Sequence, residues 1–331
     1  MSKPLVLVTS TNVSELAQEL LRGAGADIAF MHNPVDEKAV LSEFTRRRVD
    51  AVLLRGPAPF TPAVFAAARD LRIISKHGAG IDSVDLECAT AHGVAVMVTS
   101  GANADAVAEH ALALMLCLAR ELPRFDRELR KGVWRDPAYL VTDFRSRTVG
   151  IVGHGQIGRR TARLASACGA RVLIHSRARS ELPQGMEWEQ SLEKLLGRVD
   201  ILSLHCPLTD KTRGMIGEKE LRRMKPGALL INTARGKLID EPALVAALQS
   251  GRLAGAGLDT FAMEPVDPAN PLLVMPNVVC TPHIAAFTTD AAVQMGTIAA
   301  HNIISYLRGE IYDARNFLNP VVAGKKKRTG S

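Results

Sequence analysis

The sequence is poor in cysteine and lacks any long hydrophobic run. Its five cysteines are widely separated, and no two of them form a CxxC pair. This spacing excludes a disulfide framework and a zinc site, and it is typical of reduced core thiols in the cytoplasm. The longest apolar helical stretch, 111–119, is too short to cross a bilayer, and the N-terminus has no extended hydrophobic segment of a signal peptide. We therefore expect a cytoplasmic protein with no membrane contact and no bound metal.

An excess of negative charge is also missing, since the formal net charge is +7 at pH 7. Part of the positive charge lies together near the C-terminal end, in Lys325, Lys326, Lys327 and Arg328. A terminal basic run is usually a solvated tail, so residues 321–331 are expected to be disordered. The rest of the chain is only mildly basic, which small anionic ligands explain as well as a polyanion does. We expect no nucleic-acid partner.

The chain is too long for one hydrophobic core, because single cores stop growing at roughly 250–300 residues. It has 331 residues and opens with short β-rich runs that alternate with helical segments. The predicted strands are 5–9, 28–31, 51–54, 73–76 and 94–98, and the predicted helices between them include 14–22, 36–48 and 62–69. Continuous apolar strands separated by helices are typical of a parallel sheet covered on both faces. This part predicts one α/β domain.

A second and more regular series begins at Thr148. Residues 104–120, which precede it, are almost continuously apolar, so both faces of this helix are expected to be buried. Residues 288–308, which follow it, form a predicted helix that returns to the first domain. We thus expect a Rossmann domain, residues 103–285, inserted into a flavodoxin-like domain made of residues 1–102 and 286–320. Six predicted strands support a doubly wound nucleotide-binding domain: 149–152, 172–175, 201–205, 229–232, 255–259 and 278–280.

The first strand of this series runs directly into a glycine-rich turn. The motif GHGQIG stands between a strand and the start of a helix. Gly153 permits the tight turn, Gly155 lets the backbone approach a pyrophosphate, and Gly158 allows the helix to pack closely on the strand. The amides of Gln156 and Ile157 then face the phosphates at the positive end of the helix. This context predicts a dinucleotide-binding site.

The acidic residue that would hold a ribose 2′-hydroxyl is missing at the end of the second strand, which reads HSRAR. Ser176 can hydrogen-bond a 2′-phosphate, and Arg177 and Arg179 can neutralise it, because a guanidinium matches phosphate geometry. The alternative is that these arginines are simply exposed loop residues. The pattern favours NADP over NAD as the cofactor.

With its further motifs, the chain resembles the D-isomer-specific 2-hydroxyacid dehydrogenase family over residues 5–320. The resemblance implies hydride transfer between NADP or NAD and a small 2-oxo acid or D-2-hydroxy acid. It also implies a homodimer joined around residues 104–145. The matching stretches are His77 to Asp82, Asn103 to His110, the glycine motif, His205 to Thr209, Asn232 to Gly236, Leu258-Asp259, Glu264-Pro265 and Thr281 to Ile284.

The resemblance implies a catalytic set of Arg235, Glu264 and His283. Reduction of a 2-oxo acid places negative charge on the carbonyl oxygen as hydride arrives, so a proton donor and a fixed cation lower the barrier. His283 suits the donor, Glu264 would orient its ring and favour its charged form, and Arg235 can grip the substrate carboxylate. Any one of these residues alone is more often a surface histidine or part of an ordinary ion pair. The three together, in family order, predict an active site.

The resemblance also implies groups that bind the substrate and the cofactor. The turn formed by His77, Gly78, Ala79 and Gly80 is implied in substrate binding, although Lys76 and His77 could equally face solvent, and Trp134 could either shape the pocket or simply pack. The implied cofactor contacts outside the glycine motif and the 176–179 loop are His205, Pro207, Thr212, Thr233, Ala234, Asp259 and Ala285. For Asp259, a structural role in a turn is an equal alternative.

Several functions fit this architecture. Glyoxylate and hydroxypyruvate suit an NADPH-dependent reductase, whereas 3-phosphoglycerate needs a phosphate site that no motif supplies, and no appended regulatory domain is expected after residue 320. A D-3-phosphoglycerate dehydrogenase-like activity is therefore the second choice. A non-catalytic nucleotide-sensing protein similar to the C-terminal-binding corepressors is a further alternative, although no partner motif is present. A formate dehydrogenase-like activity is disfavoured, because Glu264 stands where a glutamine is typical of that activity.

Overall fold

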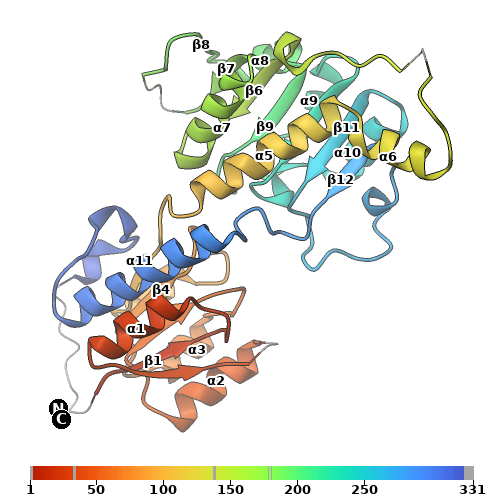
Figure 1. The fold of residues 1–331 in the computed structure, drawn as a ribbon. Helices are drawn as coiled ribbons and strands as arrows, with labels where there is room; N and C mark the ends of the chain where they lie inside the picture. The colour runs from red at the N-terminus through yellow and green to blue at the C-terminus, as the bar shows by residue number, and fades with distance from the viewer. Residues whose placement is uncertain (1–2, 33–34, 137–138, 178, 180, 324–331) are drawn as a thin grey trace. The chain divides into compact units, whose positions relative to one another are not determined.

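The computed structural model describes residues 3–32, 35–136, 139–177, 179 and 181–323. The chain divides into two compact units (Figure 1), which we call unit 1 and unit 2. Unit 1 comprises Met1–Asn103 and Thr288–Ser331, and unit 2 comprises Ala104–Phe287. Unit 2 is thus inserted between two segments of unit 1. The sequence placed the corresponding boundaries after residues 102 and 285.

Unit 1 is built on a five-stranded parallel sheet with the order β2-β1-β3-β4-β5. Successive residues of a strand enter opposite cores: Val6 and Val8 lie in one apolar cluster and Leu7 in the other. Burial on both faces explains why these strands are continuously apolar. The order is that of a flavodoxin-like sheet and confirms the predicted fold class. The strands are β1 (Leu5–Val8), β2 (Asp27–Phe30), β3 (Ala51–Leu54), β4 (Ile73–Lys76) and β5 (Ala95–Met97).

Helices cover both faces of this sheet. Helices α1 (Glu15–Gly23) and α11 (Thr289–Leu307) pack side by side against one face (Figure 1). The other face is covered by α2 (Glu37–Arg46), α3 (Pro62–Ala67) and α4 (Leu86–Ala91). Helix α11 begins where the sequence predicts, because the Thr288 hydroxyl accepts a hydrogen bond from the amide of Ala291 at 3.2 Å.

The prediction that a disordered tail starts at residue 321 was wrong. A short 3₁₀ helix covers Pro320–Val322, and Val322 is completely buried in the apolar cluster beneath α1 and α11. The basic run dominated the sequence-based interpretation of this segment, whereas Val322, which precedes it, packs into the core of unit 1. The basic residues Lys325 to Arg328 lie outside the described residues.

Unit 2 is built on a seven-stranded parallel sheet with the order β12-β11-β10-β9-β6-β7-β8. The six predicted strands are present, and the doubly wound class is confirmed. The additional strand, β8, was missed because it has three half-buried residues, one of them Glu187, and lies at the edge of the sheet. The strands are β6 (Thr148–Val152), β7 (Arg171–His175), β8 (Met186–Trp188), β9 (Ile201–Leu204), β10 (Ala228–Asn232), β11 (Leu253–Leu258) and β12 (Val278–Cys280).

Helix α5 (Ala104–Ala119) packs on this sheet through one side, together with α7 (Gln156–Ala167). Helix α5 can approach β11 closely because β11 has glycines where the helix crosses it. A Cβ added to Gly257 would lie 3.0 Å from the Cβ of Leu114. The expectation that both faces of α5 are buried was wrong for the isolated chain, since Glu109 and Ala113 are exposed. Helices α8 (Leu192–Arg198), α9 (Glu218–Arg223) and α10 (Glu241–Gln249) cover the other face.

The strand order places a switch point between β6 and β9. From β6 the chain winds outward through β7 and β8, and it then returns to pair β9 with the opposite side of β6. Ligands of open α/β sheets bind at the carboxyl ends of the strands at such a point. The glycine-rich turn follows β6, and His205 follows β9. Among the described helices, none combines the length and apolarity that crossing a bilayer requires.

Candidate active site

His283 and Glu264 are in direct contact in the loops that follow β12 and β11. The distance from His283 Nδ1 to Glu264 Oε2 is 2.7 Å. Since an ionised carboxylate only accepts hydrogen bonds, Nδ1 carries a proton, and Nε2 is left for another partner. The two side chains are 49% and 37% exposed, so a ligand can reach the pair.

This contact changes the acidity of both groups. The hydrogen bond with Glu264 raises the pKa of His283, and the charges of Glu264 and Asp259 add to that rise against the opposing effects of burial and Arg235. Burial by itself raises the pKa of Glu264, but the hydrogen bonds donated by His283 and the Phe261 amide outweigh it and leave that pKa below its ordinary value. The imidazole therefore stays protonated above its usual range, beside an ionised carboxylate.

Asp259 holds the loop that carries His283. The side chain is fully buried, and its two oxygens accept hydrogen bonds from the amides of Ile284 at 2.8 Å and Ala285 at 3.0 Å. His283 itself has a φ of 53°, in the left-handed region that side chains other than glycine seldom occupy. The contacts of Asp259 support its structural role in a turn, and its role as a cofactor contact stays a prediction.

Arg235 lies in the turn after β10, close to this pair. Its charge acts on the pKa values of both Glu264 and His283. Asn232, which is completely buried, fixes the turn: its Nδ2 donates to the carbonyl of Arg235 at 2.9 Å, and its Oδ1 accepts from the amide of Ala234 at 3.0 Å. Unit 2 therefore brings together a guanidinium, a carboxylate and an imidazole from three separate loops.

The glycine-rich turn has the space that a dinucleotide phosphate requires. A Cβ added to Gly153, whose φ is 100°, would lie 2.6 Å from the carbonyl oxygen of His205, and one added to Gly158 would lie 2.0 Å from that of Gly153. These two glycines allow the turn to close and α7 to pack. A Cβ on Gly155 would meet no atom within 4 Å, so the backbone is open to a ligand there. The residues present fit a nicotinamide dinucleotide.

The other sequence-predicted cofactor residues have different surroundings. The Thr233 hydroxyl is buried and has no hydrogen-bond partner within the described residues, as expected of a group that awaits a ligand. The Thr212 hydroxyl instead donates to the Pro207 carbonyl at 2.7 Å and so shapes the loop itself. Burial lowers the pKa of His205 to about 4, and its Nε2 contacts the Ser203 hydroxyl at 2.8 Å. His205 is therefore neutral at physiological pH.

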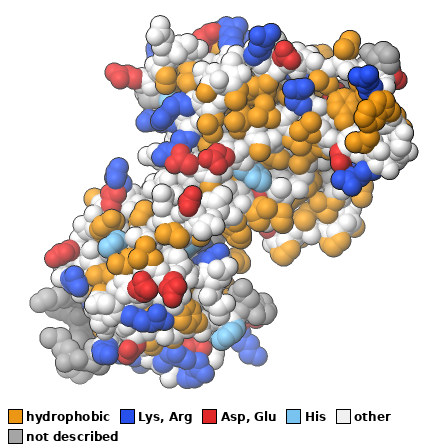
Figure 2. Space-filling view, viewed as in Figure 1, with side chains coloured by type: hydrophobic (Ala, Val, Ile, Leu, Met, Phe, Trp, Pro, Cys, Tyr) orange, Lys and Arg blue, Asp and Glu red, His pale blue; other side chains and the backbone are white. Residues whose placement is uncertain are grey.

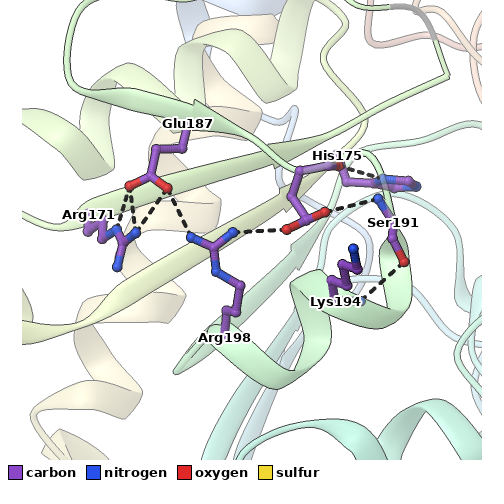
Figure 3. A network of polar contacts seen from close by, with 7 residues as sticks. Arg171, His175, Glu187, Ser191, Lys194 and Arg198 are labelled. Carbon is purple, nitrogen blue, oxygen red and sulfur yellow. Dashed lines mark hydrogen bonds and ion pairs between the residues drawn. The ribbon is translucent and has the colours of Figure 1, made fainter.

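The loop after β7 is anchored by a polar network that links β7, β8 and α8 (Figure 3). Glu187 bridges Arg171 and Arg198, and Arg198 also pairs with Glu189 at 2.9 Å. His175 Nδ1 donates to the Glu189 carbonyl at 3.0 Å, which holds the residue just before Ser176 and Arg177. Glu187 and Glu189 are thus already paired with arginines.

The arginines of this loop are accessible to a ligand. Arg177 and Arg179 are exposed, and Ser176 is half-buried. Burial raises the pKa of the Cys206 thiol, and the charge of Arg177 opposes that rise, which indicates that Arg177 lies near the end of β9. Arg179 lines a cavity of about 390 Å³ together with Trp188, Glu189, Gln190, Ser191 and Lys194.

In unit 1, the turn after β4 uses part of its polar groups internally. His77 is buried, and its Nε2 donates to the Ala292 carbonyl at 3.2 Å. Burial and the charge of Arg55 lower the pKa of His77 to about 4, so it is neutral and cannot supply a positive charge to a substrate. The Gly78 amide donates to the Thr99 hydroxyl at 2.9 Å.

The amides of Ala79 and Gly80 remain available for a ligand, because no acceptor in the described part of the chain pairs with them. Lys76 Nζ donates to the Gly56 carbonyl at 2.5 Å. The amides of Ala79 and Gly80 are therefore better suited to bind a substrate than the ring of His77 is.

Two supporting residues were not singled out from the sequence, although both lie inside its matching motifs. Asn232 fixes the Arg235 turn, and Thr281 donates to Asp259 Oδ1 at 2.6 Å. A polar residue at the end of an apolar parallel strand was the available signal, because such a residue is at least half-buried and must find a partner.

Comparison with known proteins places this geometry in context. A model of the NAD binding domain of D-isomer specific 2-hydroxyacid dehydrogenases matches residues 112–285. The chain is 38% identical to a glyoxylate reductase of Korarchaeum cryptofilum, over 93% of this chain and 94% of that one. It is 34% identical to a D-3-phosphoglycerate dehydrogenase of Archaeoglobus fulgidus, over 93% of this chain but only 58% of the longer relative.

Solved structures agree with the sequence relatives. A glyoxylate reductase from Paecilomyes thermophila has a TM-score of 0.82 at 32% identity, covering 94% of this chain and 98% of that one. An acyclic imino acid reductase in complex with NADPH and D-Arg has a TM-score of 0.84 at 27% identity, covering 95% of this chain and 99% of that one.

Proposed function

Because the chain belongs to the D-isomer specific 2-hydroxyacid dehydrogenase family, we propose that it reduces a small 2-oxo acid with NADPH, with glyoxylate or hydroxypyruvate as the preferred substrate. The observation that carries this proposal is the 2.7 Å contact between His283 and Glu264, with the charge of Arg235 acting on both groups. The similarity to glyoxylate reductases along nearly the whole length supports the substrate class.

The three side chains divide the work of the reaction. Arg235 binds the substrate carboxylate and polarises the adjacent carbonyl. His283 gives the proton on Nε2 to the carbonyl oxygen as negative charge develops there, and in the reverse direction it takes that proton back. Glu264 keeps Nδ1 occupied and stabilises the imidazolium. The nicotinamide, when bound, donates or accepts the hydride at the second carbon of the substrate.

For the cofactor, we propose that the glycine motif holds the pyrophosphate and that Ser176, Arg177 and Arg179 hold the 2′-phosphate of NADP. The neutralised carboxylates Glu187 and Glu189 support this preference, because they leave the loop cations to attract an anion. The NADPH complex of a structural neighbour is consistent with it. The remaining cofactor contacts and the amides of Ala79 and Gly80, as substrate ligands, belong to the same proposal.

A panel of 2-oxo acids assayed with NADPH and NADH tests the function. We expect turnover of glyoxylate and hydroxypyruvate, with kcat/KM for NADPH at least about tenfold above that for NADH. Arg177→Gln should lower the NADPH value roughly ten- to a hundredfold, as expected for one lost charge-assisted hydrogen bond, and leave the NADH value unchanged. Arg22→Gln, a surface change in unit 1, serves as the control.

Each other outcome of the panel selects an alternative. Equal values with the two cofactors would remove the NADP preference, and oxidation of 3-phosphoglycerate in place of glyoxylate reduction would favour the D-3-phosphoglycerate dehydrogenase-like activity. A panel without any turnover, with the dinucleotide still bound, would favour a nucleotide-sensing protein.

Glu264→Gln is expected to shift the pH dependence of reduction. Glutamine still accepts a hydrogen bond from Nδ1 but lacks the charge that raises the pKa of His283. Because His283 must be protonated to act as the donor, the rate of reduction is highest below the pKa of His283 and falls as pH rises through it. The alkaline limb of the kcat profile should therefore move to lower pH. At a given pH on that limb, kcat should be about tenfold lower for each unit by which the pKa of His283 falls.

The control for this change is Glu218→Gln, which alters an exposed acid of the same unit. An alkaline limb at the same pH in Glu264→Gln and in the wild type would show that another group supplies the proton.

We also propose that two copies of the chain associate through unit 2. Figure 2 shows apolar side chains gathered over the part of unit 2 that carries α5 and α6 (Leu122–Arg130). In α6 and the segment after it, the exposed large apolar residues are Leu122, Leu129, Val133, Trp134 and Leu140, with Leu140 87% exposed. Exposed apolar side chains in such number are typical of an interface between proteins. A cytoplasmic location is proposed on the five free thiols.

A further inference from the structure

A chain of hydrogen bonds joins helix α5 to the loop that carries His283. His110, on α5, places its Nε2 2.9 Å from the hydroxyl of Thr281. That hydroxyl lies 2.6 Å from Asp259 Oδ1. His110 is 22% exposed and Asp259 1%, so this connection is largely shielded from water.

The direction of each hydrogen bond follows from the groups themselves. A hydroxyl has one hydrogen, and a carboxylate can only accept, so Thr281 donates to Asp259. The Thr281 oxygen then accepts from His110, whose Nε2 must carry a proton. His110 Nε2 is 3.8 Å from Asp259 Oδ1, too far for a direct hydrogen bond. The influence of His110 on Asp259 therefore passes through the Thr281 hydroxyl.

The orientation of Asp259 matters because its oxygens are shared. Oδ1 also accepts the Ile284 amide at 2.8 Å, and Oδ2 accepts the Ala285 amide at 3.0 Å, both directly after His283. The amide of His283 bonds the Thr281 carbonyl at 3.0 Å, so the residue is held from both sides. Without such restraint, a histidine at φ 53° would relax toward an ordinary backbone conformation.

We propose that His110 is a positioning residue of the active site, which orients Asp259 through Thr281 and thereby fixes the backbone at His283. The proposal rests on the proposed function, because it assigns His110 to the same reaction. Among the described residues, His110 bonds Thr281, whereas His283 and Glu264 bond each other, so the effect of His110 on that pair is indirect.

Replacement of His110 by Leu and by Gln separates positioning from packing. Leucine removes the donor, whereas glutamine retains an N–H group that can reach the Thr281 hydroxyl. We expect His110→Leu to lower kcat roughly ten- to a hundredfold, as a small misplacement of the proton donor does, with KM for NADPH unchanged. The alkaline limb of the kcat profile of this variant should move to lower pH, because the charge of a displaced Asp259 raises the pKa of His283 less. His110→Gln should recover most of kcat.

Thr281→Val and Thr281→Ser test the middle of the chain. Serine keeps the hydroxyl and should stay within about threefold of the wild type, whereas valine should behave like His110→Leu. The double variant His110→Leu/Thr281→Val should be no slower than Thr281→Val alone, since both changes break one connection. Multiplying effects would overturn the proposal, as would an unchanged kcat in His110→Leu.

Two further measurements keep the test decisive. His301→Leu, a half-buried helical histidine of unit 1 that stacks on Tyr312, controls for the loss of an imidazole in a helix. The pKa of the His283 ring, measured by NMR, needs no turnover, and it should fall in His110→Leu and recover in His110→Gln. An unchanged ring pKa in His110→Leu would overturn the positioning role, whereas absence of turnover in the wild type would overturn only the proposed function.

Discussion

His283→Asn is expected to reduce turnover by roughly 10²–10⁴-fold, the range typical of a lost general acid, without lowering the stability of the fold. The amide of asparagine cannot donate a proton to the substrate at physiological pH. At the same time, asparagine adopts the left-handed backbone conformation more readily than most residues, and His283 has a φ of 53°.

The stability of this variant depends on two small opposing effects. The side chains of His283 and Glu264 are 49% and 37% exposed, so their ion pair contributes about 0–1 kcal/mol. The lower cost of the left-handed backbone conformation for asparagine offsets a loss of that size. We therefore expect the free energy of unfolding to stay within about 1 kcal/mol of the wild type, measured by denaturant titration beside kcat.

Glu121→Asn is the matched control, because Glu121 also has a positive φ, of 50°, and it lies at the start of α6, outside the loops that carry Arg235, Glu264 and His283. It should keep full turnover. A His283→Asn variant that unfolds far more easily than the wild type would mean that the imidazole mainly supports the fold.

Gly236→Ala is expected to damage both stability and turnover. A Cβ at this position would lie 1.9 Å from the carbonyl carbon of Phe261 and 2.1 Å from its oxygen, and these backbone atoms cannot move independently. The Phe261 amide donates to Glu264 Oε1 at 3.0 Å, and Gly236 directly follows Arg235. Any shift that admits the methyl group therefore separates the guanidinium from the carboxylate.

We expect a loss of about 3 kcal/mol or more in the free energy of unfolding and at least about a hundredfold in kcat/KM. Gly197→Ala in α8 is the control, since its Cβ would meet only the Arg223 carbonyl oxygen, at 4.0 Å. In a helix that change should be neutral or stabilise by up to about 1 kcal/mol. Equal behaviour of the two variants would contradict the argument from backbone contact.

The elements that the sequence predicts well are those whose pattern reflects burial on both faces. Strands such as Ala51–Leu54 are apolar at every position, and the glycine motif occurs at the predicted strand-to-helix turn. Strand β8 was missed because it has only three residues, all half-buried, and its central residue Glu187 is held by ion pairs that form only after β7 and α8 are in place.

Side-chain roles were less predictable than positions. His77 looks like a substrate ligand beside a glycine turn, yet its ring is buried against the Ala292 carbonyl from a segment far away in the chain. Helix α5 looks fully buried because it is apolar all round, whereas the structure exposes Glu109 and Ala113. The local pattern specifies neither which distant segment covers His77 nor which side of α5 the sheet covers.

By itself, the sequence determined the two parallel sheets and the glycine-rich turn, because periodicity and glycine placement are local properties of the chain. The resemblance to the family, and no local pattern, singled out Arg235, Glu264 and His283, and their catalytic role stays a prediction. Only the tertiary structure decided how these groups act on one another. The 2.7 Å contact of His283 with Glu264, the hydrogen bonds of Asp259 to the loop that carries His283 and the approach of Gly236 to Phe261 all join separate loops. Hydrogen bonds and steric contacts depend on distances of a few ångströms, which exist only once the β-strands have paired in register.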